Sequence, residues 1–294
     1  MASLSPQNTK YCFRKPGAVS PSLGLGQSYW ALTHRELPME ASLEQACRDG
    51  FEYFEAGLSE DRISETRALL QRFPLKLIAQ GWAPSAGEAA AFFQRAAELG
   101  AIALNLHLGH AYLTTSEAVD MTGEVQRQAE AFGIPLLLET HRGRLTQDLF
   151  RTAELLAQLP EIAITLDVSH YIVASENLGG AEELFRACMA PLLARTALIH
   201  GRISNGQSSQ VRVDDGFAFT TVTQSLWRQA MQLWLADAPA DAVLIFEPEL
   251  GPPPYAFLDP SGAETFSRTA ETRRLTELGR DAWAAAHAGA LAAT

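Results

Sequence analysis

Lysine is nearly absent from this chain. Only Lys10, Lys15 and Lys76 occur among the 294 residues. Lys76 stands at the start of an apolar run rather than at its end. If these apolar runs are strands with the catalytic residues at their C-terminal ends, no lysine lies at such an end. No lysine is then placed to form a Schiff base or to transfer a proton. The scarcity of lysine therefore excludes lysine-dependent aldolases and similar enzymes.

Paired cysteines, apolar runs of membrane length and excess positive charge are also lacking. Cys12, Cys47 and Cys188 are odd in number and far apart, which favours unpaired thiols in a reducing compartment, and we expect a cytoplasmic protein. No apolar run approaches the length of about 18 residues that a membrane span needs, and residues 1–21 lack the apolar stretch of a secretory signal. The net charge of -11 argues against nucleic acid or an anionic membrane as the main partner.

Long linkers, low-complexity tracts and glycine-rich phosphate loops are missing as well. No Gly-x-Gly-x-x-Gly or Walker A loop follows the first apolar run, which disfavours a doubly wound open sheet, the second candidate fold. What is present is a regular alternation of strand-like and helical patterns. Strands are expected at residues 24–30, 53–57, 76–81, 103–108, 135–141, 162–170, 196–204 and 243–250. Helices are expected at residues 42–49, 60–73, 85–100, 116–133, 146–159, 181–193, 222–236 and 264–287.

Eight strands that alternate with helices in 294 residues predict a single (β/α)8 TIM barrel, a fold of the α/β class. Residues 23–294 are expected to form this barrel domain. Residues 1–22 precede it as an N-terminal arm, which is either poorly ordered or added to the sheet as a short strand. The active site of such a barrel lies at the C-terminal ends of the strands.

Four of the apolar runs end in a side chain that can bind a metal ion. These side chains are Glu139, Asp167, His200 and Glu247. Side chains alternate along a strand, so each shares the inward face with the apolar residue two positions earlier. Neighbouring strands lie about 4.8 Å apart, so the four ends can converge on one ion. Three carboxylates and one imidazole favour Mn²⁺, Mg²⁺ or Co²⁺, and Zn²⁺ is compatible. One divalent metal ion is therefore the expected cofactor.

The same strand ends resemble those of a known family. The segments Leu138-Glu139, Leu166-Asp167-Val168-Ser169-His170, Ile199-His200 and Phe246-Glu247-Pro248 look like the motifs of the sugar phosphate isomerase and epimerase family. These are xylose-isomerase-like TIM barrels, and they belong with the family 2 apurinic endonucleases to one superfamily. The resemblance covers nearly the whole barrel.

The resemblance implies roles for particular residues. Glu139, Asp167, His200 and Glu247 would be the metal ligands, and His170 would hold a substrate oxygen. Glu139 and Glu247 would also be the catalytic pair that removes and returns a proton. This agrees with elementary chemistry, because a hydroxy-ketone bound to a divalent ion has an acidified C–H that a carboxylate can deprotonate to an enediolate.

The sequence departs from the ketose 3-epimerases after the seventh strand. It reads His200-Gly201-Arg202, without the glycine-glutamate pair that usually follows the histidine in those enzymes. Arg202 shares the face of His200 and could bind a carboxylate or phosphate of the substrate. The alternative for Arg202 is a salt bridge at the rim with Asp214 or Asp215.

Further residues are expected to touch the substrate. Glu55 and His107 end the second and fourth strands and are candidates for substrate contacts, although internal hydrogen bonds at the barrel top are the alternative. Trp82 and Tyr255 could form an apolar wall against a sugar face. For these aromatic residues the alternative is that they only pack loops on the barrel.

Three further polar positions receive other assignments. His141 is interpreted as a rim residue and Asn105 as structural. The third strand ends in Gln80-Gly81-Trp82 and supplies none of the extra histidines that apurinic endonucleases use. DNA repair is therefore disfavoured, and a true xylose isomerase is disfavoured by the missing lysines.

The leading hypothesis is a metal-dependent isomerase or epimerase of a small hydroxy-ketone, namely a sugar, sugar acid or cyclitol. One alternative is a dehydratase of the inosose or dehydroshikimate type that uses the same site. Another is a barrel that binds a ligand without catalysis, although all four ligand positions are intact. The expected partner is a small carbohydrate-like molecule, with no nucleic acid and no membrane, and a homo-oligomer is compatible with the sequence.

Overall fold

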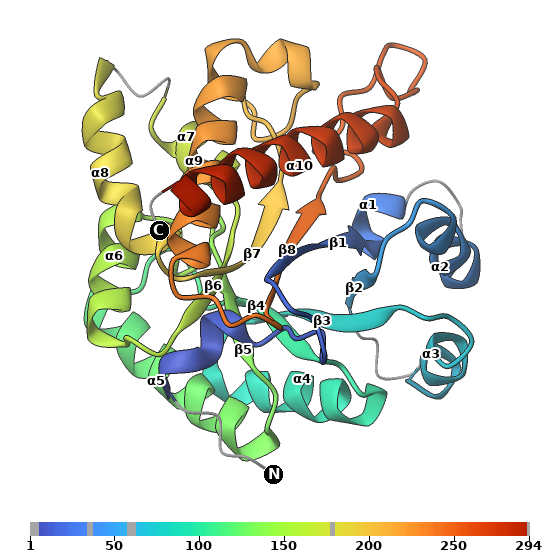
Figure 1. Ribbon diagram of the computed structural model, residues 1–294, viewed down its shortest axis with the longest axis vertical. Helices are drawn as coiled ribbons and strands as arrows, with labels where there is room; N and C mark the ends of the chain where they lie inside the picture. The colour runs from blue at the N-terminus through green and yellow to red at the C-terminus, as the bar shows by residue number, and fades with distance from the viewer. Residues whose placement is uncertain (1–5, 34–37, 58–62, 177–179, 293–294) are drawn as a thin grey trace.

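The computed structural model describes residues 6–33, 38–57, 63–176 and 180–292. Its centre is a closed barrel of parallel strands in sequence order, so the predicted TIM barrel is confirmed (Figure 1). The strands are β1 (Ser22–Ser28), β2 (Tyr53–Gly57), β3 (Lys76–Ala83), β4 (Ala103–Leu108), β5 (Leu136–Glu139), β6 (Ala163–Leu166), β7 (Thr196–Gly201) and β8 (Val243–Pro248).

Helices surround this barrel and connect its strands (Figure 1). The α-helices are α1 (Tyr29–Leu32), α2 (Met39–Arg48), α3 (Ile63–Leu70), α4 (Ala86–Leu99), α5 (Thr115–Phe132), α6 (Leu149–Gln158), α7 (Val168–Ala174), α8 (Glu182–Leu193), α9 (Ala218–Leu235) and α10 (Arg268–Ala292). Residues 60–62 of one predicted helix lie outside the described residues. None of the described helices is both long and apolar enough to cross a membrane.

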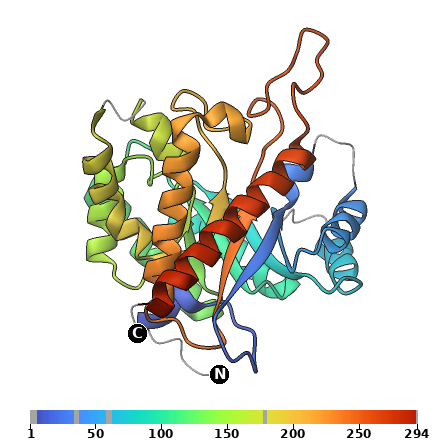
Figure 2. The same ribbon diagram turned by 45° about the horizontal axis from the view of Figure 1, so that its top comes forward.

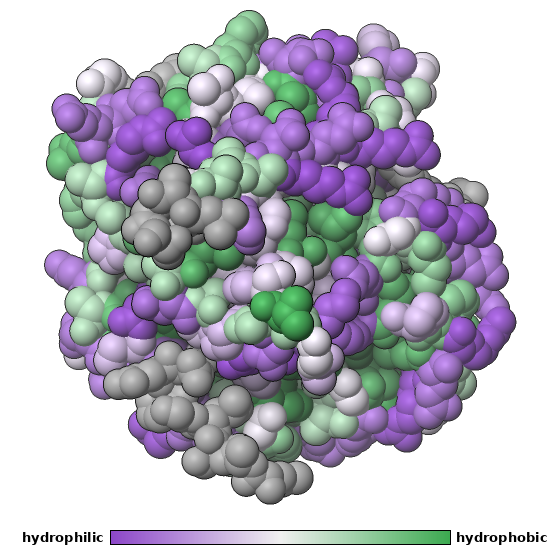
Figure 3. Space-filling view, in the orientation of Figure 1, coloured by the Kyte–Doolittle hydropathy of each residue, from purple (hydrophilic) through white to green (hydrophobic). Residues whose placement is uncertain are grey.

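Helix boundaries follow local chemistry. At α5 the Thr114 hydroxyl accepts a hydrogen bond from the Glu117 N–H, and the Glu117 carboxylate accepts one from the Thr114 N–H, which forms a capping box. Gly133 ends the same helix in the left-handed region at φ 67°. Polar and charged side chains gather along the N-terminal half of α10, on the outer surface of the molecule (Figure 3).

The inward faces of the strands divide into an apolar floor and a polar top. Tyr53, Ile78, Leu137, Leu198 and Ile245 are at most 2% exposed and form the inner apolar layer. The polar residues stand two positions further along the same strands, as the alternation of strand side chains predicts. The register confirms this layering where β7 and β8 pair, because His200 lies beside Glu247. The top of the barrel therefore collects the polar side chains.

The N-terminal segment closes the opposite end of the barrel. Phe13 is 1% exposed and packs with the inner apolar layer, with its ring 6.0 Å from the ring of Tyr53. The Tyr11 hydroxyl donates a hydrogen bond to the Trp234 carbonyl at 3.0 Å, and the backbone of Arg14 forms an isolated antiparallel β-bridge with Ala242. The part of the predicted 1–22 arm that the structure describes is thus packed beneath the barrel, and residues 1–5 lie outside the described range.

Candidate active site

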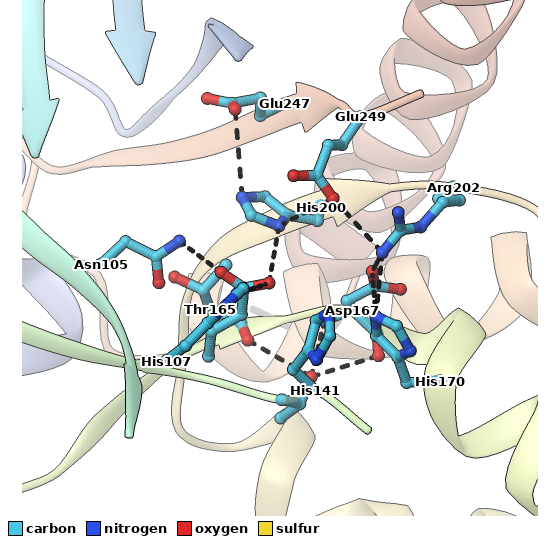
Figure 4. A network of polar contacts seen from close by, with 12 residues as sticks. Asn105, His107, His141, Thr165, Asp167, His170, His200, Arg202, Glu247 and Glu249 are labelled. Atoms are coloured by element: carbon cyan, nitrogen blue, oxygen red, sulfur yellow. Dashed lines mark hydrogen bonds and ion pairs between the residues drawn. The ribbon is translucent and has the colours of Figure 1, made fainter. Parts of the chain in front are cut away.

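The C-terminal mouth of the barrel holds a group of buried carboxylates (Figure 4). Each of the five is at most 2% exposed. They come from β2, β5 and β8 and from the residues just after β6 and β8, and they are Glu55, Glu139, Asp167, Glu247 and Glu249. Burial of this much like charge is unfavourable unless cations or protons compensate it. The electrostatics of the site therefore depend on what is placed between the carboxylates.

His200 lies among four of these carboxylates. Its Nε2 is 3.6 Å from Oε1 of Glu55 and 4.0 Å from Oε1 of Glu247. Its Nδ1 is 3.7 Å from Oε1 of Glu139 and 3.5 Å from Oε2 of Glu249. Burial alone would lower the pKa of the His200 imidazole, but the carboxylates, with Glu249 first, outweigh burial and raise it well above its usual value. We call these five residues the His200 cluster.

Glu139 is held by two polar neighbours from β4. Asn105 Nδ2 donates to Oε2 of Glu139 at 2.7 Å and to Oε2 of Glu55 at 2.9 Å. His107 Nε2 lies 2.7 Å from Oε1 of Glu139. Burial would raise the pKa of Glu139, but the His107 and His200 imidazoles outweigh it and hold this pKa well below its usual range. Glu139 is therefore an ionised carboxylate in a fixed orientation.

Glu247 has no such support. Among the described residues, neither of its carboxylate oxygens has a hydrogen-bond partner, although the side chain is fully buried. Burial, followed by the negative charge of Glu55, raises the pKa of Glu247 well above its usual value. Burial likewise raises the pKa of Glu249 to about 7. The His200 cluster thus has more acid than its own bases neutralise.

Gly26 on β1 makes the space that the Glu247 carboxylate fills. A Cβ at this position would lie 2.6 Å from Oε2 of Glu247 and 3.2 Å from Cγ2 of Ile245. We therefore expect Gly26→Ala to displace the Glu247 carboxylate and to lower the free energy of unfolding by about 1–3 kcal/mol, measured in urea. Gly123→Ala, where the nearest atoms are 3.9 Å away, is the matched control and should not destabilise the protein. Equal stability of the two variants would contradict this packing.

Arg202 and Asp167 form a buried ion pair. Nη2 of Arg202 makes a short contact with Oδ2 of Asp167 and lies 3.3 Å from Oε2 of Glu249. Nε of Arg202 donates to Ser169 Oγ at 3.2 Å, and Ser169 Oγ donates to Oδ1 of Asp167 at 2.6 Å. Burial opposes the charge of Arg202, but the carboxylates of Asp167 and Glu249 raise its pKa above its usual value.

The alternative of a rim salt bridge for Arg202 is wrong. Arg202 is 1% exposed, and its carboxylate partners are Asp167 and Glu249. Asp214 pairs with Arg274 at 2.5 Å, and Asp215 pairs with Arg212 at 2.8 Å. The arginine side chain points inward because the alternation of β7 continues past the strand, which places it on the face of His200.

Three histidine rings lie close together, tilted against one another, beside this ion pair. The His141 ring centre is 4.4 Å from that of His107 and 4.0 Å from that of His170, which lies on α7. His170 Nε2 is 3.0 Å from Arg202 Nη2. Burial, followed by the charge of Arg202, lowers the pKa of His170 well below its usual value, and burial lowers that of His141 to about 2. Both rings are therefore neutral at physiological pH.

A pocket of about 230 Å³ opens above these residues. Its walls are Trp30, Gln80, His107, Glu139, His141, Arg144, Arg202, Glu249 and Tyr255. His107, Arg202 and Tyr255, which the sequence assigned to substrate binding, thus line one pocket. Glu55 lies deeper, in the His200 cluster, and His170 lies against His141. Trp82 is 49% exposed, and the Arg144 guanidinium carbon lies 4.6 Å from its ring centre.

Trp30 and Tyr255 cover one side of the pocket. Their rings meet edge to face with centres 5.1 Å apart. Gly251 lies against the Trp30 indole, and the Gln210 side-chain amide fixes Gly251 by two hydrogen bonds, Nε2 to its carbonyl at 3.0 Å and its N–H to Oε1 at 2.6 Å. The segment that carries Tyr255 projects from the barrel between β8 and α10 (Figure 2).

The Gly251 contact can be tested directly. A Cβ at this position would overlap the Trp30 ring, so Gly251→Ala should move Trp30 and open the pocket. We expect a raised KM or a weaker ligand affinity, together with a red shift of tryptophan emission. Gly87→Ala is the control, because only Ser85 Oγ at 3.9 Å is near its added methyl group. Unchanged emission and affinity in Gly251→Ala would contradict a role for Trp30 as a wall.

The donor set of the site fits a divalent cation. Ligand atoms of His107, Glu139 and His141 lie within 4.8 Å of one another, and so do those of Glu55, His200 and Glu249. Carboxylate and imidazole groups are suited to Mg²⁺, Mn²⁺, Co²⁺ and Zn²⁺. Glu139, His200 and Glu247 of the expected ligand set lie together in the His200 cluster, whereas Asp167 is bound by Arg202.

Three residues take part in the site that the sequence analysis did not assign to it: Glu249, Asn105 and His141. Glu249 stands two residues after Glu247, so the alternation of β8 places both on one face and could have indicated it. Asn105 bridges two carboxylates, and its position on the inward face of β4 was the available signal. His141 follows the end of β5, and no sequence pattern shows that its ring turns back between two other histidines.

The fold and the site together define a (β/α)8 TIM barrel with an acidic, histidine-containing centre at its C-terminal mouth. No protein-family profile matches the chain, and no curated protein matches it in sequence. Solved structures do match. A protein of Rhodospirillum rubrum assigned as a xylose isomerase shares 15% identity at a TM-score of 0.61, with 88% of this chain and 99% of that chain covered.

Two further solved structures are similar. AsbF of Bacillus anthracis, assigned as a 3-DHS dehydratase, shares 16% identity at a TM-score of 0.57 over 86% of this chain and 99% of its own. A xylose isomerase-like TIM barrel protein of Mycobacterium smegmatis, solved with magnesium, shares 12% identity at a TM-score of 0.57. The match covers 89% of this chain and 98% of that chain. At these identities the likeness establishes the fold, and the resemblance seen in the sequence is confirmed at that level.

Proposed function

We propose that the protein is a divalent-metal-dependent isomerase or epimerase that moves a proton next to the carbonyl of a small hydroxy-ketone, such as a sugar, sugar acid or cyclitol. The observation that carries this proposal is the His200 cluster, in which Glu247 is fully buried and both of its oxygens lack a hydrogen-bond partner among the described residues. A buried carboxylate is stable in such a place when a cation binds it.

The residues proposed to hold the ion belong to the His200 cluster. Glu139, His200 and Glu247 belong to the set expected from the sequence, and Glu249 replaces Asp167 as the fourth ligand. Asp167 is assigned instead to Arg202, with which it makes a short contact. When bound, the ion supplies positive charge that polarises the substrate carbonyl and stabilises the oxyanion.

Glu139 and Glu249 are the proposed proton-transfer groups. Both line the pocket, from β5 and from the segment after β8, whereas Glu247 stands two residues deeper on β8. The sequence expectation paired Glu139 with Glu247, and the pocket lining favours Glu249 for the second position. The pKa of Glu139 is lowered, and a hydrogen bond from Asn105 fixes its orientation, as a general base requires. A carboxylate at either side of the substrate can then take and return a proton.

Incubation of the metal-loaded protein with ketoses, keto-acids and inososes in D₂O tests the proposal. Deuterium incorporated into an otherwise intact or isomerised substrate supports proton transfer, and Glu139→Gln should abolish the incorporation. Loss of the mass of water would identify the dehydratase, in which the enediolate expels a β-hydroxyl. Absence of both exchange and water loss across the panel, with metal bound, would favour a barrel that binds a ligand without catalysis.

A further inference from the structure

Arg202 has donors that its protein partners leave unused. Its Nε and Nη2 are engaged by Ser169, Asp167, Glu249 and His170. Nη1 is buried and has no hydrogen-bond partner among the described residues, while the side chain as a whole is 1% exposed and lines the pocket. A guanidinium presents its N–H groups in a rigid planar fork, so fixing Nε and Nη2 also fixes the direction of Nη1.

Two more arginines lie in or near the pocket wall without a carboxylate partner among the described residues. Arg144 lines the pocket, and its Nε is buried and lacks a hydrogen-bond acceptor in the described chain. The guanidinium carbons of Arg142 and Arg202 both lie 5.1 Å from the Tyr255 ring centre. Neither Arg142 nor Arg144 has a described carboxylate oxygen within 4.0 Å, although the protein has a net charge of -11.

The pocket is therefore lined by both acidic and basic side chains. Glu139 and Glu249 of the His200 cluster line it, and so do Arg144 and Arg202. A neutral polyol would satisfy the acidic side and leave the arginine donors unused. A molecule with an anionic end would satisfy both, because carboxylate oxygens accept the parallel N–H groups of arginine. The pocket volume of about 230 Å³ suits a small molecule.

We infer that the substrate of this site is a hydroxy-keto acid whose carboxylate is bound by Nη1 of Arg202 and by Arg144. The inference rests on the proposed function, because the carbonyl end of the same molecule would meet Glu139 and Glu249. It narrows the substrate class to acids, with a terminal carboxylate favoured over the bulkier phosphate ester by the small volume of the pocket. Neutral ketoses of the same length should bind weakly.

The test compares three probes that differ at one end: D-fructose, D-fructuronate and D-fructose 6-phosphate. Binding to the metal-loaded full-length protein is measured by calorimetry. We expect the acid to bind at least about tenfold more tightly than the neutral ketose, as a charge-assisted arginine contact implies. Arg144→Gln should remove most of this preference, because it should weaken binding of the acid far more than binding of fructose. Arg212→Gln, an exposed arginine paired with Asp215, makes the same charge change and should retain the preference.

Each outcome decides the inference separately from the proposed function. Equal or undetectable binding of the acid and the neutral ketose by the wild-type protein would overturn it, and so would a preference for the phosphate ester. An equal loss of preference in Arg144→Gln and Arg212→Gln would show a general charge effect and would overturn the assigned contact. Tight, Arg144-dependent binding of the acid without deuterium exchange or water loss would support the inference while the proposed reaction fails.

Discussion

Glu139→Gln is expected to lower kcat by about 10²–10⁴, the range that a positioned general base contributes. Glutamine keeps the shape of the side chain and an oxygen that can accept from Asn105, but it cannot take a proton and is a weaker partner for a cation. The rate of solvent deuterium exchange into the substrate is the direct measurement, because it reports proton removal independently of the product formed.

The control for this variant is Glu154→Gln. Glu154 lies on α6, and its carboxylate accepts a hydrogen bond from Thr115 at 3.0 Å, away from the pocket. It makes the same charge change without touching the site and should leave exchange unchanged. Exchange by Glu139→Gln at the rate of the wild-type protein would remove Glu139 from the mechanism.

Asp167→Asn is expected to lower the free energy of unfolding by about 3 kcal/mol, because it removes the nearest carboxylate from a fully buried arginine. In this variant Glu249 remains 3.3 Å from Arg202 and still compensates part of the arginine's buried charge. The expected loss of unfolding free energy is therefore at the lower end of the range for a broken buried ion pair. Urea unfolding monitored by circular dichroism measures the change.

Asp215→Asn provides the comparison for an exposed pair. Asp215 contacts Arg212 at 2.8 Å, but both side chains are about half exposed, so the loss should be small. Comparable destabilisation of the two variants would show that burial does not set the strength of the Asp167–Arg202 pair. Full retention of stability in Asp167→Asn would contradict the role assigned to Asp167.

The architecture could be predicted because it rests on repetition. Each strand and helix is a local pattern, and strands in sequence order close a barrel whose polar ends must meet. Alternation along the strands also placed Glu139, His200 and Glu247 on the inward face, and these three lie together. The same alternation, continued two residues past Glu247, places Glu249 on the inward face as well.

What the sequence could not settle is the pairing of charges within the site. Asp167 and Arg202 are 35 residues apart, and either could have turned to another partner at the crowded top of the barrel. Residues 168–170 were expected to continue a strand, whereas they begin α7, whose first turn is capped by the Asp167 side chain through Ser169 N–H at 2.9 Å. That turn places His170 against Arg202. Such choices depend on the packing of several loops.

The metal content of the purified, metal-loaded protein tests the central claim most directly. The wild-type protein should retain stoichiometric divalent metal after gel filtration, Asp167→Asn should retain it as well, and Glu247→Gln should lose it, with each variant shown to be folded by circular dichroism. This pattern follows from the position of Glu247 in the His200 cluster and of Asp167 against Arg202. Absence of metal from the folded wild-type protein, or undiminished metal in Glu247→Gln, would contradict the account.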